Sequence, residues 1–173
     1  QSISSAPALF RVEGSIVAVF GTGKMLEASE REPGASGFPV QSVYAVFDGS
    51  TSSQRTLTPA DLKKLDVTDS TWLGADFSWG IPSSDPQAPQ VYAGWYFDFP
   101  SGTSTGERQV GMLLSLPGTV VFNTLMSTSD GCASGGSSSA SYTLSLFTGG
   151  GSRVVIDRVL ADPLALEGAT TID

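Results

Sequence analysis

Acid–base chemistry in this chain would have to come from its carboxylates. A glycosidase needs only two of them, one acid and one base, held at the right separation. The candidates stand mostly in turn contexts, where Asp is favoured because it bonds the nearby backbone. They are Asp48, Asp61, Asp66, Asp69, Asp76, Asp85, Asp98, Glu107, Asp130 and Asp157. The sequence does not pair them, so we expect no enzyme and assign no catalytic residue, with a hydrolase kept as an alternative.

The chain contains no histidine and a single cysteine, Cys132. The lack of histidine removes the usual general base, the usual zinc ligand and every Ser-His or Cys-His nucleophile. One cysteine excludes an internal disulfide and a thiolate metal cluster within this chain. Cys132 either pairs with a cysteine outside the segment or stays a free thiol. The Asp-x-Asp-x-Asn/Asp-Gly spacing of a calcium loop is also missing, so we expect no metal or cofactor site.

The segment Gly21-Thr22-Gly23-Lys24 superficially resembles a phosphate-binding loop. A P-loop needs a glycine five residues before the Gly-Lys pair and Ser or Thr after the lysine. Ala18 and Met25 occupy those positions. The segment is therefore better interpreted as a turn that follows a strand, with Lys24 in solvent.

The aromatic cluster after Gly94 allows two interpretations, a sugar-binding platform or a core strand. Alternation along a strand places Trp95, Phe97 and Phe99 on one side and Tyr96 and Asp98 on the other. Because aromatic side chains contribute heavily to burial, we favour core for the first three.

The composition favours an extracellular β protein of one domain. Of the 173 residues, 15% are charged and 40% hydrophobic, so Ser, Thr, Asn, Gln and Gly must supply much of the polar surface. The net charge is −8, with 9 basic and 17 acidic residues and no basic stripe, which argues against nucleic-acid binding. No apolar run reaches the roughly 20 residues of a membrane span, so we expect no membrane insertion. The N-terminus is typical of a mature or excised segment.

Short apolar runs separated by Gly, Pro and Ser predict an all-β fold of antiparallel strands. One helix of about two turns is predicted at Leu57–Leu65, where Thr58 can cap, Pro59 suits the first helical position and Asp61 favours the positive end. Residues 27–37 and 127–139 are expected to be surface loops. The predicted strands are Ser15–Phe20, Val40–Phe47, Val91–Phe99, Gln109–Leu116, Thr119–Met126, Ala140–Phe147 and Ser152–Val159.

Six motifs occur in order across most of the chain, and together they resemble one family. The set resembles the C-terminal β-propeller region of the PilC/PilY family of type IV pilus-associated proteins. Met25 departs from the aromatic residue usual there, and the family's calcium-binding loop has no match in this chain. The motifs are Phe20–Lys24, Gln41–Asp48, Leu57–Leu62, Gly94–Pro100 with Gly106–Arg108, Val121–Leu125 with Ser129–Cys132, and Leu146–Gly150.

The resemblance implies that residues 1–173 are one β-rich segment, the C-terminal part of a larger quinoprotein-like propeller. It also implies an extracellular, pilus-associated protein that takes part in pilus biogenesis, adhesion and twitching motility by protein contact. Partners would be the remainder of the same protein, other pilus subunits, or a host receptor or glycan. Two alternatives stay open, a structural subunit of an extracellular filament and a carbohydrate-binding β domain. Whether the chain is a fragment or an independent subunit also stays open.

Overall fold

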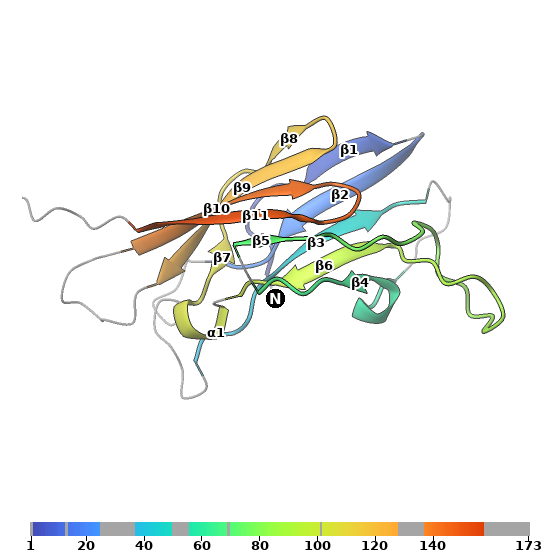
Figure 1. Ribbon diagram of the computed structural model, residues 1–173, viewed down its shortest axis with the longest axis horizontal. Coiled ribbons are helices and arrows are strands. Elements are labelled where there is room, and N and C mark those ends of the chain that lie inside the picture. Colours follow the sequence, from blue (N-terminus) through green and yellow to red (C-terminus); the bar gives the residue numbers. More distant parts are fainter. Residues whose placement is uncertain are drawn as a thin grey trace, which may run out of the picture.

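The computed structural model shows an all-β molecule made of two sheets that are not closed into a barrel (Figure 1). It describes residues 2–12, 14–24, 37–49, 56–68, 70–100, 102–127 and 137–157. The first sheet has the order β1-β2-β3-β6-β4, with β1 Ala8–Val12, β2 Ser15–Gly21, β3 Ser42–Phe47, β6 Gly94–Asp98 and β4 Lys63–Lys64. The second has the order β5-β11-β10-β9-β7, with β5 Thr71–Trp72, β11 Gly151–Asp157, β10 Ser137–Ser145, β9 Thr119–Ser127 and β7 Arg108–Gln109, while β8 Leu114–Leu116 pairs with β9.

The two sheets share one core, built by alternate residues of their strands. In the first sheet β2, β3 and β6 each turn one face inward, and Trp95 and Phe97 of β6 are fully buried. In the second sheet Phe122 of β9 and Tyr142 of β10 stack with ring centroids 5.0 Å apart. Phe97 stacks on Tyr142 at 5.9 Å, which joins the two sheets. The predicted core role of Trp95, Phe97 and Phe99 is confirmed, because these side chains are at most 2% exposed.

Several predicted strand boundaries differ from the structure, and Val91–Phe99 is observed as β6 Gly94–Asp98. The predicted strand Gln109–Leu116 is split into β7 and β8, and the side-chain amide of Gln109 donates to the carbonyl of Gly111 between them. β10 begins at Ser137, inside the predicted 127–139 loop, because Ser137 to Ser139 continue the ladder with β9. The remainder of that loop, most of the 27–37 loop and the end of the predicted strand at 158–159 lie outside the described residues.

The predicted two-turn helix at Leu57–Leu65 is wrong in extent. Only a 3₁₀ turn, η2 Pro59–Asp61, forms there, with the Asp61 carboxylate accepting from the Thr58 backbone N–H at 2.7 Å. At Leu62 the backbone becomes extended, and β4 pairs with β6 in parallel. Buried Leu65 alternates with exposed neighbours, which is the period of a strand and not of a helix. A four-residue helix that was not predicted, α1 Gly102–Thr105, forms between β6 and β7.

The turn between β10 and β11 joins the two sheets through tryptophan hydrogen bonds. All three indole N–H groups of the chain donate to its carbonyls, from Trp72 to Gly149 at 2.8 Å, Trp79 to Phe147 at 3.0 Å and Trp95 to Leu146 at 2.8 Å. At Gly149 φ is +67°, and an added Cβ would overlap Leu65 and Trp95, so the turn needs glycine there.

The propeller prediction is not confirmed by this architecture. Within the described residues the strands form two facing sheets, each with additions outside a simple up-and-down order, such as the parallel strand β4. In the same part of the chain no helix is long and apolar enough to span a bilayer.

Candidate functional site

Glu107 and Arg153 form an ion pair on the buried side of the second sheet. Glu107, at the start of β7, is 0% exposed and its carboxylate receives several donors. At Oε1 it accepts from Thr124 at 2.7 Å and from Tyr142 at 2.8 Å, and at Oε2 it forms an ion pair with Arg153 at 2.8 Å. The Arg153 Nε–H also donates to the Tyr142 hydroxyl oxygen at 2.8 Å. We call these four residues the Glu107 cluster.

The Glu107 cluster shifts the pKa of two of its members, Tyr142 and Arg153. Burial, followed by the negative charge of Glu107, raises the pKa of the Tyr142 phenol far above its ordinary range. Burial alone would lower the pKa of Arg153, but its hydrogen bond and ion pair with Glu107 outweigh this and raise it. Because the carboxylate is enclosed and bound by donors, it cannot serve as a base for a solvent-borne substrate. The cluster ties β7 to β9, β10 and β11.

The Gly21-Thr22-Gly23 segment forms the surface against which β7 packs. A Cβ on Gly21 would overlap the side chain of Gln109, and one on Gly23 that of Arg108. The backbone N–H groups of Thr22 and Gly23 donate to carbonyls within the chain, at 2.8 and 2.7 Å. These N–H groups are therefore unavailable to a phosphate, and we interpret the Gly21–Gly23 segment as structural and not as a P-loop. Lys24 was predicted to lie in solvent, but it is half-buried and its carbonyl accepts from Arg108.

β7 uses its remaining polar side chains in the same packing. The Arg108 guanidinium donates to the carbonyls of Gly106 at 2.7 Å and Lys24 at 2.9 Å, and lies over the Phe38 ring. Gln109 accepts from the Ser5 hydroxyl at 2.7 Å. Two of the sequence motifs, Phe20–Lys24 and Gly106–Arg108, are therefore in direct contact in the fold.

The described carboxylates predicted as candidate acids are not gathered into one site. Asp48, Asp66, Asp76 and Asp85 are exposed, and Asp85 accepts from the Gln87 backbone N–H in a local turn. Asp61 bonds Thr58, and Glu107 is buried in its cluster. Asp157 ends β11, and Asp69, Asp130 and Cys132 lie outside the described residues. Within the described ranges no group of three or more His, Cys, Asp or Glu is placed to hold a metal ion.

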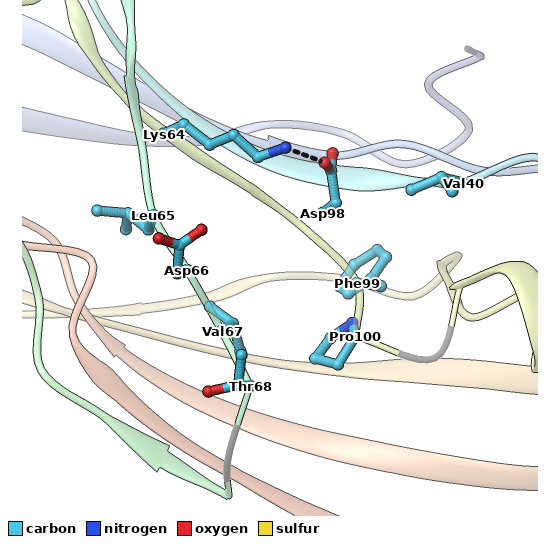
Figure 2. Close-up of a pocket in the computed structure, with 9 residues that line it drawn as sticks. All are labelled: Val40, Lys64, Leu65, Asp66, Val67, Thr68, Asp98, Phe99 and Pro100. Carbon is cyan, nitrogen blue, oxygen red and sulfur yellow. Dashed lines mark hydrogen bonds and ion pairs between the residues drawn. The ribbon is translucent and has the colours of Figure 1, made fainter.

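One shallow pocket brings two carboxylates and a lysine to the edge of the first sheet (Figure 2). The Asp98 carboxylate accepts from Lys64 at 2.8 Å and from the Ser42 hydroxyl at 2.7 Å. The hydrogen bond to Asp98, followed by its charge, raises the pKa of Lys64. Asp66 borders the same pocket, whose volume is about 280 Å³. This polar pocket can receive a small polar group or a partner's side chain, but the pairing of Asp98 leaves it poorly suited to catalysis.

Aromatic side chains form a row across the outer side of the first sheet. Phe20 of β2 stacks on Tyr44 of β3 at 5.4 Å between centroids, and Tyr44 stacks on Tyr96 of β6 at 5.6 Å. The Lys64 ammonium lies 5.8 Å from the Tyr96 ring centroid and covers that end of the row. Since the rings face one another, they present edges outward. A sugar ring would require an open aromatic face, which this row does not offer in its interior.

The fold and these sites define a two-layered β module in which Glu107, Arg108 and Arg153 serve in packing. Comparison with known proteins relates it to a class of pilus proteins. The chain is similar to the type IV pilus biogenesis factor PilY1 of Pseudomonas aeruginosa, in strains PAO1 and PAK. In both, the identity is 29% over 167 residues, which covers 87% of this chain and 14% of the relative. The chain thus spans about one seventh of the length of the relatives it matches. No family model and no solved structure matches it.

The sequence did not predict the Glu107 cluster. Glu107 stood among the possible acids and in one motif, but nothing local indicated that it is buried. Its partners Thr124, Tyr142 and Arg153 come from three other strands, so the cluster depends on the strand order of the second sheet. The one available signal was the unbroken polar run Glu107-Arg108-Gln109 between a glycine and an apolar strand.

Proposed function

We propose that this chain is a non-enzymatic β module of a type IV pilus biogenesis protein and acts through protein contacts. The observation that carries the proposal is the similarity to PilY1, which extends over 87% of the chain and not over one motif alone. The site geometry is consistent with a non-enzymatic role, because the buried Glu107 carboxylate is already bound by Thr124, Tyr142 and Arg153.

Finer elements of the proposal follow from the same resemblance. The module would be extracellular and pilus-associated, would require no cofactor of its own, and would form part of a larger propeller. Its partners would be the remainder of the same protein and other pilus components. Roles in adhesion and twitching motility would follow from its place at the pilus.

A filament subunit is a second candidate, favoured by one observation. β5 pairs with β11 only at Gly151 and Ser152, and beyond them Val154, Val155 and Ile156 are between 44% and 60% exposed. An apolar strand edge of this kind can pair with another chain. Ordered oligomers of the purified chain, detected by light scattering behind a sizing column, would favour this candidate.

The main proposal is tested with a chimera in P. aeruginosa. This chain replaces the matched segment of PilY1, and pilin sheared from the cell surface is compared with that from cells whose PilY1 lacks the segment. We expect the chimera to restore surface pili above the deletion strain. A matched chimera carrying Glu107→Ala is the control for loss of folding, because this substitution removes the carboxylate at the centre of the Glu107 cluster. A chimera present at normal levels that gives no surface pili would contradict the proposal.

A further inference from the structure

The outer side of the first sheet carries apolar residues where a solvated sheet face usually carries polar ones. The cross-strand pairs place Phe20, Tyr44 and Tyr96 in one row and Ala18 and Val46 in the next. Ile16 follows on β2 and is 38% exposed. We call these six residues the outer face.

The inner sides of the same strands build the core, where Val19, Ala45 and Trp95 are 0% exposed. Strands that are apolar on both sides are typical of sheets covered on both faces. The central strand of the second sheet shows the contrast. Ser139, Ser141, Thr143 and Ser145 form the outer side of β10, whereas the exposed apolar residues of that sheet lie on β8 and, as Val154 and Ile156, on β11.

The outer face has the anatomy of an interface, with an apolar centre and a polar rim. At one margin Lys64 pairs with Asp98, and at the other β1 presents Arg11 together with Leu9, which lies opposite Ala18 and is 64% exposed. Arg11 lies opposite Ile16 in the ladder, at the far end of β2 from Phe20.

The size of the outer face indicates which kind of partner it fits. Aromatic side chains bury about 150–250 Å² in full, and these are already half-buried, so the face offers no more than roughly 500 Å². A stable complex of separate chains takes about 800 Å² from each partner. A face of this size is sufficient only when the partner is tethered, since tethering supplies a high effective concentration.

We propose that the outer face is the docking surface for an apolar layer contributed by another part of the same, longer polypeptide. The inference rests on the proposed function to the extent that PilY1, of which this chain covers 14%, supplies the longer polypeptide. It assigns the contact to Phe20, Tyr44, Val46 and Tyr96, with Lys64 and Asp98 at its rim.

Hydroxyl-radical footprinting with peptide mass spectrometry tests this. The complete gene product that contains this chain is compared with the chain alone, without pili or cells, so the result is independent of the pilus assay. Two internal controls are available: Met112 is 88% exposed, and Tyr142 is 0% exposed. We expect Tyr44 and Tyr96 to be labelled in the isolated chain and to lose most of that labelling in the complete product, while Met112 is labelled in both.

Three results would overturn the proposal. They are equal labelling of Tyr44 and Tyr96 in the two samples, protection in the isolated chain that rises with its concentration, and full protection in the isolated chain at any concentration. If the isolated chain does not fold, the complete product alone decides. Labelling of both tyrosines near the Tyr142 level supports a covered face, and labelling near the Met112 level refutes it.

A pair of variants of the complete product separates docking from packing. Tyr96→Thr keeps a good strand former but removes a ring from the outer face, and we expect faster proteolysis between the docked parts. Thr143→Ser, on the hydroxyl-rich side of β10, is the matched control and should leave the cleavage rate unchanged. Equal cleavage rates for the two variants would contradict the proposal.

Discussion

Replacing Glu107 by glutamine tests how far the buried Glu107 cluster stabilises the second sheet. The amide oxygen of the new side chain can still accept from Thr124 and Tyr142, but the charge that compensates Arg153 is lost. Arg153 is 15% exposed, so water can solvate it only in part. Removing one partner of a buried ion pair costs about 3–5 kcal/mol, and the partial exposure of Arg153 places the expected loss near the lower end, at about 3 kcal/mol. For a chain of this length the melting temperature should fall by roughly 6–12 °C.

The reverse change should cost more. Arg153→Met leaves the Glu107 carboxylate, 0% exposed, without a countercharge, and we expect a loss of about 4–5 kcal/mol. In the double variant neither charge remains, so it should be more stable than Arg153→Met alone by about 2 kcal/mol.

Urea unfolding followed by tryptophan fluorescence measures these differences, because Trp72 and Trp95 lie against the shared core. The four proteins of the cycle are compared at one temperature and pH. A Glu107→Gln variant within about 0.5 kcal/mol of the parent would refute the reasoning, as would additive single and double variants.

Three further predictions concern the same scaffold. Gly149→Ala should lower the free energy of unfolding by about 3 kcal/mol or more, because the new Cβ meets buried neighbours at positive φ. Gly14→Ala, also at positive φ but with open space around it, should cost only about 1 kcal/mol. Urea unfolding midpoints of the two variants measure this difference. Because the pKa of Tyr142 is raised in the folded state, the unfolded chain loses this proton at lower pH. The free energy of unfolding should therefore fall as the pH rises above about 10. In thermal melts across the alkaline range, Tyr142→Phe should show a smaller fall. Lys64→Ala breaks an exposed pair with Asp98 and should change stability by no more than about 1 kcal/mol, and a larger loss in the urea midpoint would show that the pair matters structurally.

Most strands were predictable because they are short apolar runs bounded by Gly, Pro or Ser, such as Ser15–Phe20 before Gly21. Alternation is visible in β6, where Trp95 and Phe97 are buried and their neighbours Tyr96 and Asp98 are not. The core role of the aromatic cluster follows from the same alternation. The resemblance to pilus proteins was also available from the motif order, and the comparison with PilY1 agrees with it at the level of pilus biogenesis.

The segment from Leu57 to Val67 shows why other features were not predictable. Thr58, Pro59 and Asp61 give a valid helix start, and a helical turn does begin there. The helix does not continue, because Lys63 and Lys64 pair as a strand with the edge of β6. This tertiary pairing overrides the local helix propensity.

The Glu107 cluster could not be predicted from the sequence for a similar reason. A glutamate between glycine and arginine is normally a surface residue, and here its contacts with Thr124, Tyr142 and Arg153 enclose it. The contacts of Arg108 and Gln109 with Gly23 and Gly21 explain why both glycines are needed, which a turn prediction alone does not.

We propose that this chain acts in pilus biogenesis by protein contact and not by catalysis. The most direct measurement is surface pilin in P. aeruginosa carrying the PilY1 chimera, once with the chain unchanged and once with Asp66→Asn and Asp98→Asn in the pocket of Figure 2. The account predicts surface pili in both strains at similar levels. Surface pili that are lost only in the double Asn strain, with the chimera still present at normal levels, would contradict it by assigning chemistry to those carboxylates.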